Sequence, residues 1–364
     1  MKIDFIDEPE LEFGAGRHID IRFGLMNYGP LDLGESSTPK NISVGIVGTS
    51  ETIDELATWL EKCRNGIAAK SSNQPNLFVK FPGFREDNVL NTTIVLNQQL
   101  QRAVANREFD RLAGLGGSPL AVQRAVEVFL DEIKGLSEKR LANVILCAIP
   151  MSLLRQQGEA VGVSDAEAPT NEQPVLDFHH LLKAKAMEHG VPIQLILPMT
   201  WDETKRLPQK ARNVRLRSSQ DEATRAWNLH VAMYYKSGGI PWGLPRAATA
   251  LTSCHVGVSF YESLDKARLL TSVVQVFNER GEGTIVRGGP AKLGKDDRQP
   301  HLSEIGAHDI FLLALKAYRR EHRTLPARIV IHKSSSFSND ELSGFQSAAE
   351  SLGIELLARI SHKL

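Results

Sequence analysis

The chain has 364 residues, with 43 basic and 43 acidic side chains, so its formal net charge is zero. At roughly 150 residues per domain, this length predicts two to three domains. The balanced charge excludes a histone-like or polybasic protein but is compatible with a local groove that binds nucleic acid. Three widely spaced cysteines without a CxxC pair argue against a zinc ribbon or a disulfide scaffold. They are typical of a cytoplasmic protein, and no apolar run predicts a membrane span.

Residues 36–245 show a regular alternation of strand and helix patterns. Buried apolar runs at 42–48, 143–150 and 192–198 predict strands, and an amphipathic stretch at 52–62 predicts a helix. Such alternation is typical of an α/β fold with an open, mostly parallel, Rossmann-like sheet. The other predicted elements are strands at 76–81 and 92–96 and helices at 98–109, 121–136, 176–189 and 221–236.

Residues 246–364 show a different order of elements. Three strand patterns at 254–261, 270–277 and 284–287 predict an antiparallel meander. A helix, a strand, a second helix and a last strand follow at 303–322, 328–332, 339–352 and 354–360. This order matches an RNase H-like fold.

Several polar side chains could converge on one phosphate. His179 and Lys183 are four residues apart on a predicted helix and therefore share a face, and Gln194 follows on the next strand. Asn228 and Lys236 lie eight residues apart on the long helix, again on roughly one face. Such a set offers charge-assisted hydrogen bonds to a dianion. The alternative is that these are ordinary solvated surface residues.

Two serines stand at positions where RNase H-like nucleases carry carboxylates. In such nucleases two central strands each present a carboxylate, and the pair holds two Mg²⁺ ions that activate water. Here the corresponding residues are Ser259 and Ser334. A serine hydroxyl is neutral and a poor ligand for a hard cation compared with Asp. If these are the catalytic positions, the metal site is lost and the protein does not cleave nucleic acid. The alternative is that this is another α/β sheet in which the two serines have no functional meaning.

Two other interpretations stay open. An active nuclease would need other carboxylates to rebuild the metal site, and nearby acidic residues are Glu262, Asp296, Asp297 and Glu304. A nucleotide-binding α/β enzyme is the second alternative. Gly45–Gly48 lies between a strand and a helix, but the GxGxxG spacing of a dinucleotide fingerprint is absent.

The stretch from Asn228 to Trp242 reads NLHVAMYYKSGGIPW. It resembles the NxxxKxxxKxGGxPW element of prokaryotic Argonautes, specifically the short type built from MID and PIWI domains. Ala232 stands where the family has the first lysine of this element. In the second half, CHVGVSFY at 254–261 and IHKSS at 331–335 are similar to PIWI strands. Active relatives carry Asp at the two serine positions, so the resemblance implies a catalytically inactive type.

The resemblance implies a ligand for the candidate pocket. In this family the positions of His179, Lys183, Gln194, Asn228 and Lys236 hold the 5′-phosphate of the guide strand, often with a Mg²⁺ ion. No organic cofactor is implied. A basic stretch is expected to line the nucleic-acid groove with Lys205, Arg206, Lys210, Arg212, Arg215 and Arg217.

The resemblance also divides the chain. Residues 1–35, with a possible strand at 18–23, would form an N-terminal segment that packs with PIWI. Residues 36–245 would form the MID domain, and residues 246–364 an RNase H-like PIWI domain that is incomplete at its C-terminal end.

The function implied is guide-RNA-directed recognition of single-stranded DNA in prokaryotic defence against plasmids and phage. The chain would bind a small guide RNA with a 5′-phosphate and act as the sensor. Enzymatic activity would reside in a partner effector subunit, in which a PAZ-replacing domain is fused to a TIR or sirtuin-like domain that depletes NAD⁺. Base pairing would supply the sequence specificity.

Overall fold

The computed structural model describes residues 8–36, 38–85, 90–113, 118–156, 177–205, 220–245, 252–262, 269–278, 283–294, 297–354 and 356–361. The chain divides into two compact units, Met1–Trp242 and Gly243–Leu364. The boundary predicted from the sequence lies after residue 245. Each unit is described by itself.

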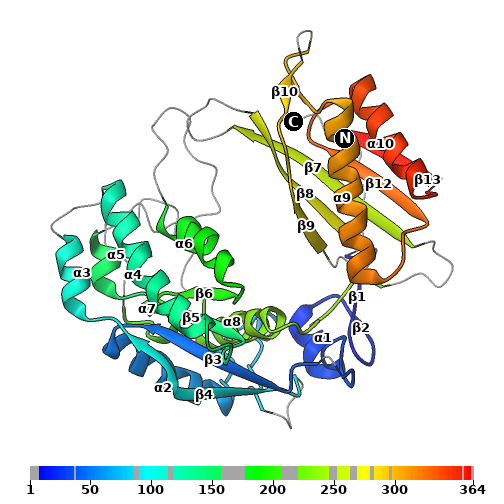
Figure 1. Ribbon diagram of the computed structural model, residues 1–364. Coiled ribbons are helices and arrows are strands. Elements are labelled where there is room, and N and C mark those ends of the chain that lie inside the picture. Colours follow the sequence, from blue (N-terminus) through cyan, green and yellow to red (C-terminus); the bar gives the residue numbers. More distant parts are fainter. Residues whose placement is uncertain are drawn as a thin grey trace. The chain divides into compact units, whose positions relative to one another are not determined.

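The first unit is built on a four-stranded parallel sheet (Figure 1). Its strands are β3 (Asn41–Gly48), β4 (Thr93–Ala103), β5 (Val144–Ala148) and β6 (Ile193–Ile196), in the spatial order β4-β3-β5-β6. Every neighbouring pair is parallel. The predicted Rossmann-like α/β fold is therefore confirmed for this half of the chain.

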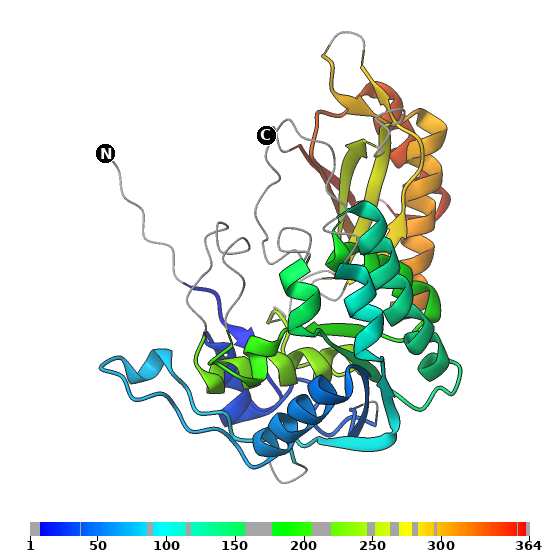
Figure 2. The same ribbon diagram turned by 90° about the vertical axis from the view of Figure 1, so that its left-hand side faces the viewer.

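Helices cover both faces of this sheet (Figure 2). The central strands β3 and β5 are therefore buried on both sides. Val44 and Val144 face a core with α2 (Ser50–Arg64) and α8 (Glu222–Lys236). Val47 and Ile145 face a second core with α4 (Pro119–Ser137) and α6 (Phe178–Ala186). The other helical segments are α3 (Asn106–Ala113), α5 (Met151–Gln156), α7 (Pro198–Trp201), η1 (Pro75–Leu77) and η2 (Met187–His189).

Two predicted elements of this unit are wrong. The stretch 76–81 forms the short helix η1 and an isolated bridge from Phe81 to Ile67 instead of a strand. The helix expected from residue 98 begins only at Asn106, because β4 continues to Ala103. β4 lies at the edge of the sheet, where polar side chains such as Gln98 and Gln99 can face solvent while Leu100 is buried. Polar residues at an edge strand weaken the alternation on which strand prediction depends.

The N-terminal segment folds with the first unit, whereas we expected it to pack with the PIWI half. It forms a hairpin of β1 (Leu11–Glu12) and β2 (Arg17–His18), followed by α1 (Ile21–Tyr28). Phe13 and Leu25 join the core that contains α8. The expected strand at 18–23 is replaced by the start of α1, because Asp20 caps this helix by accepting from the backbone N–H groups of residues 22 and 23.

The second unit contains a mixed five-stranded sheet in the order β13-β12-β7-β8-β9. β7 (Ser253–Glu262), β8 (Leu269–Asn278) and β9 (Gly283–Arg287) form the predicted antiparallel meander. β12 (Arg328–Lys333) is parallel to β7, and β13 (Leu356–Ser361) is parallel to β12. A short hairpin of β10 (Lys292–Leu293) and β11 (Pro300–His301) precedes α9 and was not predicted.

Helices α9 (Glu304–His322) and α10 (Asn339–Ser351) share one core with this sheet. Val256 and Ile331 project from the central strands into that core, where Phe311 and Phe345 meet edge to face. The strand order and the two helices follow the predicted RNase H-like arrangement. In the part of the chain that the structure describes, no helix has the length and apolar character needed to cross a membrane.

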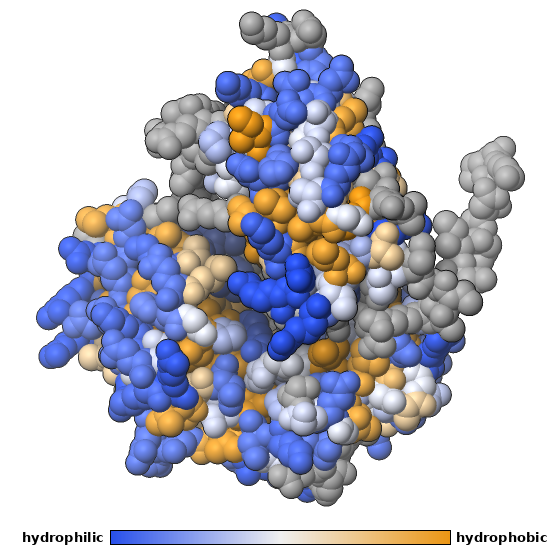
Figure 3. Space-filling view, turned by 45° about the vertical axis from the view of Figure 1, so that its right-hand side comes forward, coloured by the Kyte–Doolittle hydropathy of each residue, from blue (hydrophilic) through white to orange (hydrophobic). Residues whose placement is uncertain are grey.

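Some apolar side chains of the second unit reach solvent. Ile285 on the edge strand β9 and Ile305 and Leu313 on α9 are all exposed. Figure 3 shows one face of the molecule, on which hydrophobic side chains lie among hydrophilic ones. Isolated exposed apolar residues are common on folded proteins and by themselves indicate no function.

Candidate functional site

Helix α6 supplies two of the predicted phosphate ligands. Asp177 caps the helix by accepting a hydrogen bond from the backbone N–H of His179 at 2.7 Å. Phe178 and Leu182 face the core, so the adjacent face, with His179 and Lys183, is only partly buried. The periodicity of the helix thus brings an imidazole and an ammonium to one face, one turn apart.

Lys236 connects the last turn of α8 to the first residues of β6. Its ammonium donates to the backbone oxygen of Ile193 at 2.6 Å and to the side-chain oxygen of Gln194 at 2.6 Å. The side-chain nitrogen of Gln194 donates in turn to the oxygen of Leu195 at 3.2 Å. Lys236 and Gln194 are both partly buried. Two residues that are 42 positions apart in sequence are therefore in direct contact.

The cationic groups of α6 and α8 lie close enough to influence one another. Burial lowers the pKa of Lys236 to about 8, and the nearby Lys183 contributes in the same direction. Burial also lowers the pKa of His179, and Lys183 and Lys236 add to this effect. Desolvation and repulsion between like charges both oppose protonation. A dianion placed among these groups would reverse both effects, as expected of an anion-binding site.

Asn228 is not shown in contact with this cluster. It lies two turns before Lys236 on α8, about 12 Å away along a helix axis that rises 1.5 Å per residue. Its side-chain nitrogen donates to the side-chain oxygen of Gln220 at 2.8 Å, and Asn228 is exposed. The structure therefore brings together His179, Lys183, Gln194 and Lys236. The described contact of Asn228 is with Gln220, and its convergence with the other four residues stays a prediction.

Of the residues predicted to line the basic groove, the structure describes only Lys205. Lys205 donates to both carboxylate oxygens of Glu55, at 2.8 and 2.6 Å, and Trp201 donates to the same carboxylate at 2.9 Å. Lys205 is thus engaged in an ion pair with α2, which argues against its predicted role as a groove cation. The predicted groove residues that lie outside the described residues are Arg206, Lys210, Arg212, Arg215 and Arg217.

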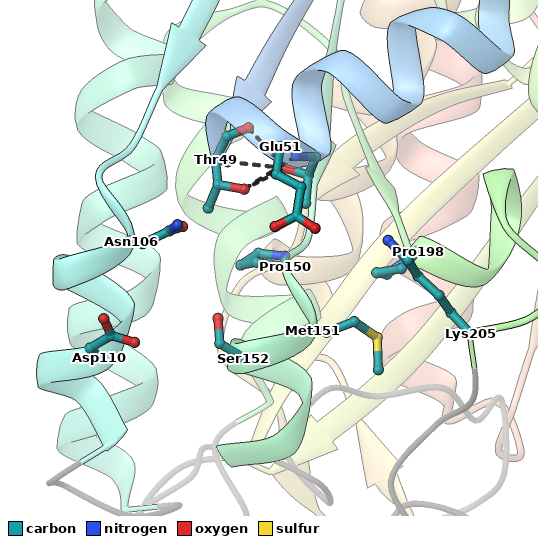
Figure 4. A pocket seen from close by; sticks show the side chains of 10 residues that line it. Thr49, Glu51, Asn106, Asp110, Pro150, Met151, Ser152, Pro198 and Lys205 are labelled. Atoms are coloured by element: carbon teal, nitrogen blue, oxygen red, sulfur yellow. Dashed lines mark hydrogen bonds between the residues drawn. The ribbon is translucent and has the colours of Figure 1, made fainter.

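A cavity of about 280 Å³ lies at the carboxyl ends of β3 and β5 (Figure 4). Thr49, Asn106 and Ser152 line it together with the carboxylates of Glu51 and Asp110. Ligands of parallel α/β sheets commonly bind at this edge. Lys205 also lines the cavity, but its ammonium is paired with Glu55, so the two carboxylates disfavour a phosphate. No residue of the predicted phosphate set is among the described residues that line the cavity.

Of the two serines of the second unit, Ser259 lies inside β7, at the register shift between Val258 and Phe260, and Ser334 directly follows β12. Val258 on β7 is the register partner of Lys333 on β12, and the N–H of Ser334 donates to the oxygen of Val258 at 3.2 Å. Ser259 directly follows Val258 and Ser334 directly follows Lys333, so the two serines lie side by side on neighbouring parallel segments. Ser259 is exposed, and Ser334 is partly buried.

The acidic residues proposed for a rebuilt metal site are described in part. Asp297 is paired with His301 at 2.8 Å, and Glu304 accepts from Ser343 at 2.8 Å. Asp296 and the side chain of Glu262 lie outside the description. Within the described residues, no group of three or more His, Cys, Asp or Glu side chains could hold a metal ion.

A buried ion pair beside these serines was not anticipated from the sequence. The ammonium of Lys333 donates to Glu341 of α10 at 2.9 Å, and both side chains are 0% exposed. Burial lowers the pKa of Lys333. Burial alone would raise the pKa of Glu341, but hydrogen bonds from Leu302, Ser338 and Lys333 outweigh it, so the pKa is lowered. Lys333 continues the apolar alternation of β12, which is the signal that could have indicated a buried lysine.

No protein-family model matches the sequence, and no curated protein matches it either. Solved structures show a similar fold. Clostridium butyricum Argonaute, bound to a guide DNA and a 19-mer target DNA, has a TM-score of 0.58 at 14% identity. That alignment covers 99% of this chain and 40% of that protein.

Two further Argonautes have a TM-score of 0.51. A. aeolicus Argonaute is 13% identical over 97% of this chain and 39% of its own. Marinitoga piezophila Argonaute, in complex with a 5′-OH guide RNA, is 9% identical over 98% of this chain and 44% of its own. The chain spans less than half the length of these proteins. At such identities the similarity shows that the chain has the fold of the MID and PIWI portion of an Argonaute.

Proposed function

We propose that this chain is the guide-binding subunit of a short prokaryotic Argonaute system and holds the 5′-phosphate of a small guide RNA. The observation that carries the proposal is the convergence of His179, Lys183, Gln194 and Lys236, from α6, β6 and α8, with a lowered pKa at Lys236. The same positions are those that the resemblance to the family assigns to the guide 5′-phosphate.

The geometry of Lys236 suits a phosphate oxygen. A protonated lysine has three N–H donors, and the two described contacts, to Ile193 and Gln194, leave one for a ligand. Lys183 would add a second charged donor from the facing helix. Hydrogen bonds between charged groups contribute about 1.5–3 kcal/mol each. Two such contacts would give a strong preference for a 5′-phosphate over a 5′-hydroxyl.

The predicted Mg²⁺ has no ready-made site among these side chains. Mg²⁺ takes oxygen ligands, and Gln194 is the one residue of the converging four with a side-chain oxygen. That oxygen already accepts from Lys236. The four residues therefore do not fit a Mg²⁺ ion by themselves, and we infer that these side chains bind the phosphate without it.

In the second unit we infer loss of slicing. Neutral hydroxyls at Ser259 and Ser334, on adjacent strands, replace the charged ligands that two Mg²⁺ ions would need. The chain would then act as a sensor that recognises a single-stranded DNA target by pairing with the guide. Target binding would bias a partner effector, with its TIR or sirtuin-like domain, toward its NAD⁺-depleting state.

A binding titration tests this proposal. Labelled single-stranded RNA with a 5′-phosphate or a 5′-hydroxyl is titrated against the full chain and against Lys183→Ala and Lys236→Ala. Lys185→Ala is the matched control, because Lys185 lies on the same helix but points away from Lys183. Strong preference for the phosphate, lost in the two variants and kept in the control, is the expected result.

Two outcomes would favour the alternatives. Equal affinity for both RNA ends would remove the phosphate pocket, and full competition by a mononucleotide would favour a nucleotide-binding enzyme. Cleavage of a paired target in the presence of Mg²⁺ or Mn²⁺ would favour an active nuclease.

A further inference from the structure

Asp32 is a deeply buried carboxylate in the turn that follows α1. Its side chain is 2% exposed and accepts two hydrogen bonds, from the hydroxyl of Tyr234 at 2.6 Å and from the backbone N–H of Ile240 at 3.0 Å. The backbone adds two contacts, since the N–H groups of Leu31 and Asp32 donate to the oxygens of Pro241 and Ile240. The N-terminal segment is thus fastened to the end of α8.

The two partners of Asp32 flank Lys236. Tyr234 lies in the last turn of α8, two residues before Lys236, and Ile240 follows the glycine turn, four residues after it. Asp32 therefore connects the two ends of the short segment 234–240, which carries the Lys236 ammonium. We call the two hydrogen bonds that Asp32 accepts, from Tyr234 and from Ile240, the Tyr234–Ile240 bracket. A helix terminus without such a bracket tends to fray.

The turn inside this bracket depends on the position of the Tyr234 ring. Gly238 has a φ of +94°, and a Cβ at Gly239 would lie 2.4 Å from the ring of Tyr234. The ring thus packs directly on the glycine backbone, and the hydrogen bond to Asp32 holds the ring in place. A small rotation of this ring would displace the turn and, with it, the end of α8.

Two hydrogen bonds compensate the charge of the buried Asp32 carboxylate. Burying a carboxylate is costly unless hydrogen bonds replace its water. Burial and the neighbouring Asp32 raise the pKa of Tyr234, so that its hydroxyl stays protonated and keeps donating. Both oxygens of Asp32 are used, one by each partner.

We propose that Asp32 is a positioning residue for guide binding, which fixes the Lys236 ammonium against Ile193 and Gln194 through the Tyr234–Ile240 bracket. This inference rests on the proposed function, because it assumes that Lys236 contacts the guide phosphate. Asp32 does not touch the guide. It acts through Lys236, so its removal should affect recognition of the 5′-phosphate and leave binding of a 5′-hydroxyl RNA unchanged.

A double-mutant cycle tests the inference in the full chain. Asp32→Asn keeps the shape of the side chain but replaces one acceptor oxygen by a donor nitrogen. We expect Asp32→Asn to weaken binding of a 5′-phosphate RNA about tenfold, a loss of about 1.4 kcal/mol. In the Lys236→Ala background the same change should cost less than about twofold, since coupled residues are not additive. Tyr234→Phe should show a smaller loss with the same dependence on Lys236.

The control is Leu112→Ala, which creates a cavity in the other core of the same unit, the one that does not contain Tyr234, and lowers stability without touching Lys236. Guide affinity of this variant should stay unchanged as long as it is folded. If Asp32→Asn does not fold, Tyr234→Phe carries the cycle alone.

The outcomes are distinguishable. A wild-type chain that shows no preference for the 5′-phosphate would refute the proposed function. A wild-type preference with unchanged affinity in folded Asp32→Asn and Tyr234→Phe would overturn the positioning role. Equal losses with and without Lys236 would also overturn it, because Asp32 would then act by another route.

Discussion

Guide affinity should fall as the pH rises above 8, because the pKa of Lys236 in the unliganded protein is about 8 instead of its ordinary 10.5. A bound phosphate dianion stabilises the protonated ammonium and returns its pKa toward the ordinary value. At pH 7 about nine-tenths of the unliganded protein carries a protonated Lys236, and at pH 9.5 only about 3% does. Binding at pH 9.5 must therefore include proton uptake by Lys236.

The expected magnitude follows from this linkage. Between pH 7 and pH 9.5 the affinity for a 5′-phosphate RNA should fall about 30-fold, or by about 2 kcal/mol. The guide phosphate itself does not titrate in this window, because its second pKa is about 6. In the unliganded protein His179 is neutral over this window, because burial lowers its pKa from an ordinary value of 6.5.

Fluorescence anisotropy at constant ionic strength would measure this dependence. Two controls separate Lys236 from general effects of pH. A 5′-hydroxyl RNA should show a much weaker dependence, and Lys236→Arg should bind with nearly constant affinity, since a guanidinium stays charged over the whole range. The reasoning would be refuted by a flat profile in the wild-type chain, or by the same 30-fold fall in Lys236→Ala.

Three further predictions follow from the contacts. Lys183→Ala should weaken 5′-phosphate binding by about 1.5–3 kcal/mol, whereas Asn228→Ala should change it little in the same titration, and an equal loss would return Asn228 to the pocket. Burial lowers the pKa of His230 to about 4, from an ordinary value of 6.5 in the unfolded chain. As the pH falls, the histidine is therefore protonated in the unfolded chain before it is protonated in the folded one. The free energy of unfolding should fall by about 2 kcal/mol between pH 7 and pH 5. Urea unfolding would measure this loss, and His230→Phe should remove it. Glu341→Gln should lower the free energy of unfolding by about 3–5 kcal/mol, because it leaves the charge of Lys333 buried without its partner; a wild-type-like urea midpoint would contradict this.

Strongly periodic segments could be predicted from the sequence, because local burial and helix capping determine them. The strand at β3 and the helix at α8 have clear apolar patterns, and each agrees with its prediction to within a residue or two. The stretch 18–23 was predicted wrongly because a single capping residue, Asp20, favours a helix over the weak alternation that follows. β4 was predicted too short because an edge strand has no need to alternate cleanly.

The candidate site depends on contacts between residues that are distant in sequence, such as Gln194 and Lys236, whereas helix geometry predicts only the pairs that lie on one helix. His179 and Lys183 share a face because they are one turn apart. Asn228 and Lys236 share a face too, but two turns separate them along the axis, and a shared face does not bring side chains to one ligand. Lys205 was expected in a groove, yet its partner is Glu55, which is 150 residues away in sequence.

The contacts of Lys236 hold its ammonium in place before the proposed ligand binds. The ammonium bonds to the start of β6 before any ligand arrives, so little conformational entropy remains to be lost on binding. This preorganisation places Lys236 in a partly buried position near Lys183, where burial and the like charge lower its pKa to about 8. A ligand dianion would offset the cost of protonating Lys236, since it supplies a negative charge beside the two lysines. The same burial that lowers the pKa of this lysine in the unliganded protein would make the proposed pocket selective for doubly charged phosphates over neutral ends, because a hydroxyl cannot compensate a second cation.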